Sequence, residues 1–213
     1  MERWVRAGFA ALVVVCLLLP PSPAAAIFQS SDVATANLKP CPKGTGMLQR
    51  YFTEQQQAGG ECLSGGPRCP TPEWRSLIEE LRLLDRQQQL ARVNAHMNRF
   101  RYIIDPINWG VDDYWTTPAE FFAKHGDCED YAIAKYLTLR AAGVPAEDMR
   151  IVVVQDMNLR VAHAVLAVYV EDKAFVLDNQ IRQVVESESI RHYRAIFSIN
   201  EQHWWLHKPA GGR

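Results

Sequence analysis

The chain carries almost no net charge, and this limits the partners it can attract. Its 213 residues include 23 Lys and Arg against 24 Asp and Glu, for a formal net charge of -1. Proteins that bind nucleic acid or anionic membranes through electrostatics need a basic surface. The composition therefore favours neither partner, and we expect no nucleic acid.

A hydrophobic run long enough for a comfortable membrane span is also missing. The most apolar stretch covers only residues 7–19, follows Arg3 and Arg6, and is succeeded by three alanines that end at Ala26. This pattern is typical of a secretory signal peptide, whereas a spanning helix needs about 20 apolar residues. We expect residues 1–26 to be a signal peptide and the mature protein to be exported without a membrane span. An uncleaved anchor helix is the alternative.

Cysteine is scarce, with 5 in the whole chain, and three of these lie close together at Cys41, Cys62 and Cys69. Export permits disulfides, and any two of the three could pair. No histidine lies among them, which argues against the rival interpretation of a zinc site. Cys128 stands apart from this group.

The remaining chain divides at about residue 71. Residues 27–70 are rich in Ser, Gly, Pro and Gln, so we expect a loop-rich, Cys-containing N-terminal segment with one short helix near residues 47–56. Residues 71–213 begin with apolar residues at helical spacing and continue with period-two strands at 151–155, 162–170 and 174–178. Helices followed by an antiparallel sheet predict an α+β domain.

Cys128 is predicted to lie in the first turn of a helix. Asp127 can cap this helix, and Asp130 occupies the position of a capping box. A helix N-terminus stabilises a thiolate, so the position suits a nucleophile. A free cysteine is nevertheless often a plain buried residue.

His163 and Asp178 are predicted to meet across a hairpin. If Glu171 and Asp172 form its two-residue turn, both side chains lie on one face as diagonal neighbours, roughly 7 to 8 Å apart at the backbone. Cys128 would then attack a carbonyl, His163 would move the proton, and Asp178 would hold the imidazole. His163 could instead be a satisfied core residue. The second oxyanion donor is open, with Trp115 or its loop as a candidate.

Three acids surround the thiol: Asp127, Glu129 and Asp130. Their charges should raise the pKa of Cys128. They could merely cap the helix, or they could bind a hard cation such as calcium, which prefers carboxylate oxygens.

Several motifs together resemble a known family. They are Asp-Tyr-Trp-Thr-Thr-Pro from residue 113, Gly-Asp-Cys-Glu-Asp-Tyr-Ala from residue 126, Ala-His-Ala-Val-Leu from residue 162 and Val-Leu-Asp-Asn from residue 176. Over residues 72–208 the chain resembles the bacterial transglutaminase-like cysteine proteinases, which include the LapG-type periplasmic proteases.

The resemblance implies a papain-like, transglutaminase-like core with Cys128, His163 and Asp178 as the triad. It implies calcium dependence through Asp127 and Glu129, with Asp130 as a further ligand. It also implies a periplasmic protease that cuts a large surface adhesin and so disperses biofilm. In such systems an inner-membrane receptor for cyclic di-GMP sequesters the protease when the nucleotide is abundant. Residues 27–70 are not part of the resemblance.

Two other functions use the same residues. The triad could transfer an acyl group to an amine, as transglutaminases and arylamine acetyltransferases do. The chain could also be an inert calcium-binding adaptor that keeps the fold without turnover.

Overall fold

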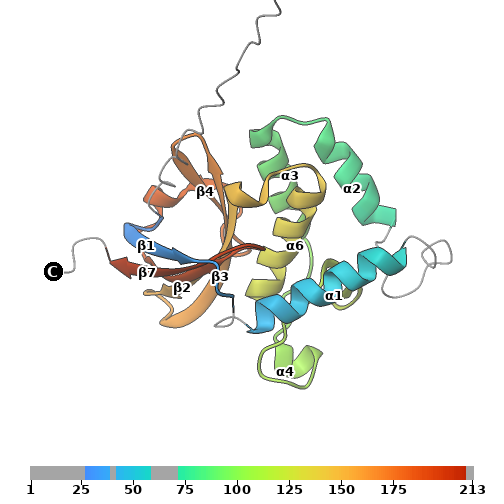
Figure 1. Cartoon of the computed structure of the whole chain (residues 1–213), viewed down its shortest axis with the longest axis horizontal. Coiled ribbons are helices and arrows are strands. Elements are labelled where there is room, and N and C mark those ends of the chain that lie inside the picture. The colour runs from blue at the N-terminus through green and yellow to red at the C-terminus, as the bar shows by residue number, and fades with distance from the viewer. Residues whose placement is uncertain (1–26, 39–41, 59–71, 210–213) are drawn as a thin grey trace, which may run out of the picture.

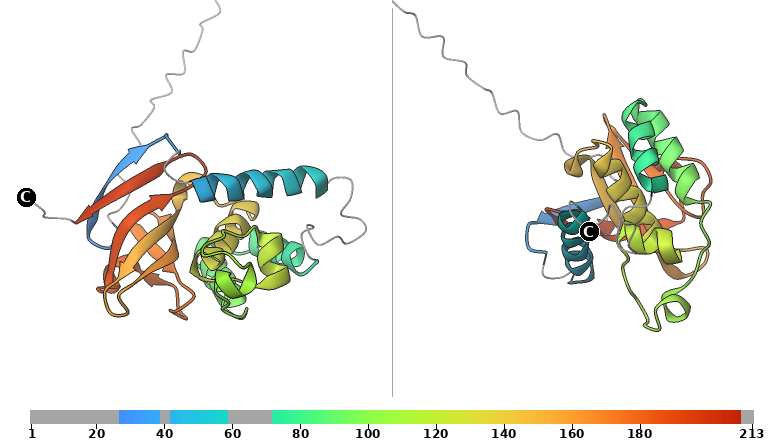
Figure 2. Two further views of the ribbon diagram at one scale, coloured as in Figure 1. Left: turned by 90° about the horizontal axis from the view of Figure 1, so that it is seen from below. Right: turned by 90° about the vertical axis from the view of Figure 1, so that its right-hand side faces the viewer.

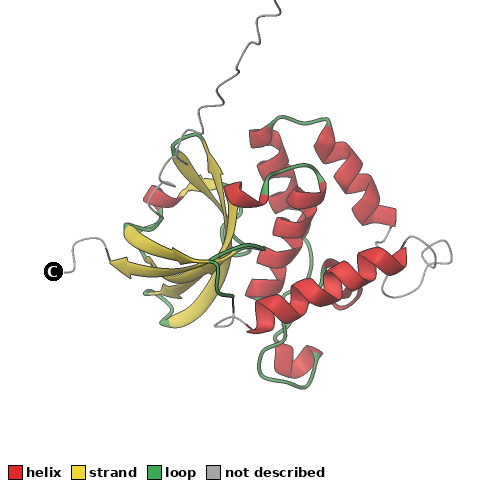
Figure 3. Cartoon of the chain, in the orientation of Figure 1, coloured by secondary structure: helices red, strands yellow, loops and turns green. Residues whose placement is uncertain are grey.

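The computed structural model describes residues 27–38, 42–58 and 72–209. The predicted signal peptide and Cys41, Cys62 and Cys69 therefore lie outside the described residues. Helices and strands separate into two layers, as Figure 3 shows, and the predicted α+β class is confirmed. Within the described ranges, no helix is both long enough and apolar enough to cross a membrane.

The helical layer follows the apolar periodicity of the sequence. Helix α2 buries Trp74, Leu77, Ile78 and Leu81 on one face. Capping boxes at Asp85 and Thr117 satisfy the first backbone N–H groups of α3 and α5. The helices are α1 (Pro42–Ala58), α2 (Pro72–Arg82), α3 (Arg86–Met97), α4 (Asp105–Asn108), α5 (Pro118–Lys124) and α6 (Cys128–Ala141).

The other layer is one antiparallel sheet of seven strands, in the order β1-β7-β6-β2-β3-β4-β5. Figure 1 shows it facing α6. Its strands are β1 (Ser30–Thr35), β2 (Met149–Asp156), β3 (Val161–Val170), β4 (Lys173–Leu177), β5 (Val185–Glu186), β6 (Tyr193–Ile199) and β7 (Trp204–Pro209). Val170 pairs with Lys173 and Leu166 with Leu177, so the predicted two-residue turn between β3 and β4 is confirmed.

The short helix predicted near residues 47–56 is present within a longer helix, but the prediction of loops around it was wrong for the described part of residues 27–70. This segment contains β1 and the 17-residue helix α1. Strand β1 is mostly exposed and is held by backbone pairing with β7, as Figure 2 shows at the rim of the sheet. Helix α1 is held by burying Met47 and Tyr51 in the core. Tertiary packing therefore decides both elements, and local propensity does not reveal it.

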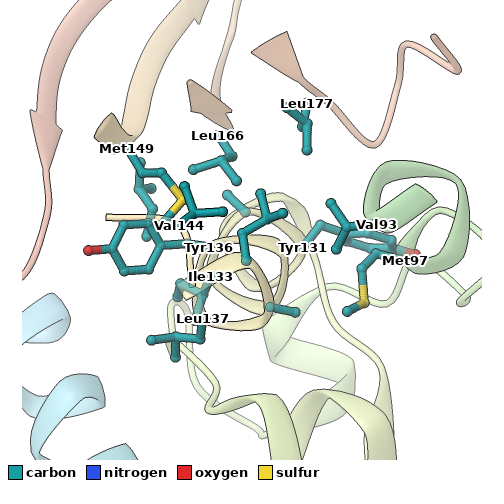
Figure 4. Close-up of a cluster of buried hydrophobic side chains, with 14 of the residues drawn as sticks. Val93, Met97, Tyr131, Ile133, Tyr136, Leu137, Val144, Met149, Leu166 and Leu177 are labelled. Atoms are coloured by element: carbon teal, nitrogen blue, oxygen red, sulfur yellow. The ribbon is translucent and has the colours of Figure 1, made fainter. Parts of the chain in front are cut away.

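Helix α6 lies at the centre of the main hydrophobic core. Ile133 and Leu137 on α6 are fully buried, as are Leu166 on β3 and Leu177 on β4. Figure 4 shows α6 beside these strand residues and also beside the α3 residues Val93 and Met97. Because α6 touches both the sheet and α3, its first turn is fixed relative to β3 and to the end of β4.

Candidate active site

The first turn of α6 is fixed by a buried carboxylate. Asp130 is completely buried, and its two oxygens accept the backbone N–H groups of Thr116 at 2.8 Å and Asp127 at 3.2 Å. Gly126 makes room for this side chain, since a Cβ there would lie 2.0 Å from Asp130 Oδ2. Asp130 thus ties the start of the helix to the loop before α5, as the predicted capping position requires.

Cys128 has a free thiol at this helix start. Its Sγ donates to Glu129 Oε2 at 3.0 Å. The backbone N–H of Ala164 and the hydroxyl of Tyr102 also face the sulfur. Burial, followed by the charges of Glu129 and Asp127, raises the pKa of Cys128. The thiol is therefore protonated in this arrangement, and its hydrogen bond goes to the adjacent residue Glu129.

His163 and Asp178 form a buried pair. They are 3% and 1% exposed, and His163 Nε2 lies 2.9 Å from Asp178 Oδ1. The same oxygen accepts the Gln180 backbone N–H at 2.8 Å, and the Tyr193 hydroxyl donates to Asp178 Oδ2 at 2.8 Å. Burial alone would raise the pKa of Asp178, but these donors, led by His163, lower it below its usual value. Asp178 is therefore a carboxylate that orients the imidazole.

The hydrogen bond to Asp178 decides which ring nitrogen of His163 is free for chemistry. With the proton on Nε2 donated to the carboxylate, Nδ1 is an acceptor, and its neighbour is the Gln180 amide at 3.4 Å. His163 is followed in β3 by Ala164, whose N–H faces the Cys128 sulfur. Of the three residues predicted as a triad, His163 and Asp178 are in direct contact, and Cys128 lies against the adjoining backbone.

The predicted acids belong to a larger acidic cluster. Oxygens of Asp105, Asp127 and Asp130 lie within 4.8 Å of one another, and so do those of Asp105, Asp113 and Glu129. Asp105 is completely buried. The Oδ1 atoms of Asp105 and Asp127 are buried without a hydrogen-bond partner among the described residues.

Asp105 and Asp113 were missed by the sequence analysis. Asp105 begins α4 and Asp113 lies in the loop between α4 and α5. The fold of this segment, which brings both acids to the start of α6, is not visible as a periodic pattern. Asp113 is also ion-paired with Lys43. Asp105 Oδ2 accepts the Tyr114 backbone N–H at 2.5 Å, which leaves Oδ1 directed elsewhere.

Burial and mutual repulsion make the ionised form of these acids unfavourable in free energy. Burial raises the pKa of Asp130 to about 8, and burial followed by the charge of Glu129 raises the pKa of Asp127. A positive charge at the cluster would offset both effects. Because the free ligand atoms are carboxylate oxygens, the cluster suits a hard cation.

Trp115, the candidate second oxyanion donor, is packed into the hydrophobic core with Met47 and Tyr136 and is 7% exposed. The side-chain donor that faces Cys128 is the hydroxyl of Tyr102, which stacks on Tyr131 at a centroid distance of 6.4 Å.

The family model of the bacterial transglutaminase-like cysteine proteinases matches residues 75–208. This chain belongs to that family. The chain is accordingly a cysteine proteinase, and the predicted transglutaminase-like fold is confirmed.

Solved structures support the assignment of this cysteine proteinase to the family. The calcium-bound LapG of Legionella pneumophila is 34% identical, with a TM-score of 0.61, over 73% of this chain and 87% of the other. The EGTA-treated form of the same protein is 35% identical, also with a TM-score of 0.61, over 74% of this chain and 86% of the other. The curated proteins gave no match.

Proposed function

We propose that this cysteine proteinase is a calcium-dependent endopeptidase that uses Cys128 as nucleophile, His163 as base and Asp178 as orienting residue. The observation that carries the proposal is the buried His163–Asp178 contact at 2.9 Å, together with a free thiol at a helix N-terminus that faces the backbone N–H of Ala164, the residue after His163. A nucleophile, a base and a group that orients the base are the parts that acyl transfer requires.

The reaction proceeds in two steps. His163 Nδ1 takes the thiol proton while the sulfur bonds to the peptide carbonyl carbon, and the same proton passes to the leaving amine as the C–N bond breaks. His163 then takes a proton from water, whose oxygen bonds to the thioester carbon. The C–S bond breaks, the acyl part leaves as a carboxylic acid, and the proton on His163 returns to the Cys128 sulfur. The Cys128 backbone N–H meets the oxyanion, and the Tyr102 hydroxyl is the candidate for the second donor.

Calcium fits the acidic cluster. Asp105, Asp127 and Glu129 would hold it, with Asp113 close by, while Asp130 keeps both oxygens on backbone N–H groups. When bound, calcium supplies positive charge that compensates the acids. In this structure the Glu129 carboxylate accepts a hydrogen bond from the Cys128 thiol. With the charges of Glu129 and Asp127 compensated, these two acids would raise the pKa of Cys128 less.

The calcium proposal is tested by titration calorimetry together with thermal unfolding. EGTA should lower the melting temperature and abolish cleavage, because the acids then repel one another. Asp105→Asn should weaken calcium binding about 10- to 100-fold, on the scale found when a group supporting a metal site is lost. The matched control is Asp112→Asn, an exposed acid of the loop after α4, which should bind calcium normally. Full activity and unchanged melting in EGTA would remove calcium from the proposal.

The substrate is a protein, and we propose that it is the N-terminal region of a large surface adhesin. We also propose that the protease is exported to the periplasm and is regulated by an inner-membrane receptor for cyclic di-GMP. The support is the family membership and the signal-like residues 1–26. The test incubates the mature protein with the host's exported proteins, with and without calcium, and identifies new N-termini by mass spectrometry. Wild-type protein should create a discrete new N-terminus, and Cys128→Ala should create none.

The same experiment separates the two alternatives. Cross-linked or acetylated products in place of cut polypeptide would mean that the acyl group passes to an amine. If Cys128→Ala kept the biological effect of the wild type, the chain would act as a calcium-binding adaptor without catalysis.

A further inference from the structure

One buried cation in α6 is not used by the proposed mechanism. Lys135 lies seven residues after Cys128 on the same helix, which is close to two full turns, so both residues face a similar direction. Its side chain is 0% exposed. Its Nζ has no hydrogen-bond partner among the residues that the structure describes.

Such a group is unfavourable for folding. Burying an ammonium without a hydrogen bond costs free energy that Leu or Met would not incur at the same position. The pKa of Lys135 shows this cost, since burial lowers it to about 7 against the opposing attraction of Asp178. A lysine inside the core of α6 therefore needs an explanation other than packing.

The charged groups around Lys135 point to one partner. Asp178 follows β4, and its attraction favours the charged lysine. From α6 itself, the Tyr131 ring lies 5.8 Å from Nζ. Asn98, the residue that caps the end of α3, contributes a neutral amide, whose Nδ2 donates to the backbone carbonyl of Asp178 at 2.7 Å. His163 from β3 and Tyr193 from β6 reach this region through their hydrogen bonds to the Asp178 carboxylate.

We propose that Lys135 is a positioning residue for proteolysis: it provides the buried counter-charge of Asp178 and so keeps that carboxylate ionised and directed at His163. The inference rests on the proposed function for its catalytic consequence. The Lys135–Asp178 coupling itself can be measured without turnover.

The first experiment compares Lys135→Met with wild type. The substitution keeps the length of the side chain and removes its charge, so kcat/KM should fall about tenfold and the acid limb of its pH profile should move up by about one unit. The melting temperature should rise by several degrees because the desolvation cost disappears. Lys173→Met is the matched control: Lys173 is exposed at the other end of β4, and both kcat/KM and the pH profile should stay as in wild type.

Opposite signs for activity and stability distinguish this role from simple packing. A variant that loses both activity and melting temperature would make Lys135 a structural residue and overturn the proposal. An unchanged pH profile would overturn it as well.

The second experiment is a double-mutant cycle followed by thermal unfolding. In an Asp178→Asn background the ammonium has lost its counter-charge, so Lys135→Met should raise the melting temperature by more than it does in wild type. Equal increments in the two backgrounds would refute the coupling. Because this cycle needs no substrate, it gives its answer even if the chain fails to cleave any protein.

Discussion

Replacing Tyr193 with Phe tests whether the orienting carboxylate is held as described. The substitution removes one hydroxyl, which donates to Asp178 Oδ2 at 2.8 Å. The ring should keep its place, because it packs edge-on against Phe28 at 5.6 Å and against His163 at 5.6 Å. The change is therefore confined to one hydrogen bond of a buried carboxylate.

The size of the effect follows from that bond. A hydrogen bond to a charged group contributes about 1.5 to 3 kcal/mol, and leaving a buried acceptor short of a donor costs a similar amount. Asp178 Oδ1 keeps His163 and the Gln180 N–H, so the carboxylate stays partly satisfied. We expect the free energy of unfolding to fall by about 2 kcal/mol. We also expect kcat/KM to fall about tenfold, since an imidazole that is less firmly oriented is a poorer base.

Tyr169→Phe is the matched control for this experiment. Tyr169 is a residue of β3, and its hydroxyl is buried without a hydrogen-bond partner in the described part of the chain. Removing an unsatisfied hydroxyl should change the unfolding free energy by less than about 0.5 kcal/mol or should stabilise the protein. Urea unfolding of both variants decides the matter. If Tyr193→Phe costs no more than Tyr169→Phe, the account of Asp178 is wrong.

Two further predictions concern other parts of the structure. His207 is buried between the Ser30 and Ser198 hydroxyls at 2.8 and 2.9 Å, and burial lowers its pKa to about 4. The unfolded chain then binds the proton more readily, so stability should be complete above about pH 6.5 and should decline by about 2 to 3 kcal/mol towards pH 4. His207→Asn should flatten this decline in urea unfolding measured across that range, and an equally steep curve would contradict it. Gly126→Ala should place its Cβ 2.0 Å from Asp130 Oδ2 and should yield little folded protein on expression, while a well-folded variant with wild-type melting would refute the close approach.

The sequence predicts the parts of the site that depend on local rules. The capping pattern of Asp127 and Asp130 locates the start of α6, and the polar turn at Glu171 and Asp172 sets the register that brings His163 to Asp178. Both follow from spacing along a few residues, and hydrogen bonds within one helix or one hairpin are enough to enforce them.

Other parts depend on contacts between distant segments. Asp105 joins the acids of α6 only because the intervening loop folds back, and β1 forms only because β7 offers it an edge. The burial of Lys135 is not predicted from the sequence either, since a lysine in a helix is ordinarily expected to face solvent. None of these placements leaves a periodic signal in the residues concerned.

The proposed reacting groups are divided between the two layers of the fold. The thiol belongs to α6, whereas the imidazole and its carboxylate belong to β3 and to the end of β4, and the apolar contacts of Leu166 and Leu177 join the layers. A slight slide of the helical layer over the sheet would therefore separate the proposed nucleophile from the proposed base while leaving each of these side chains chemically intact. A compound that wedged the two layers apart would inhibit such an enzyme without touching Cys128, His163 or Asp178.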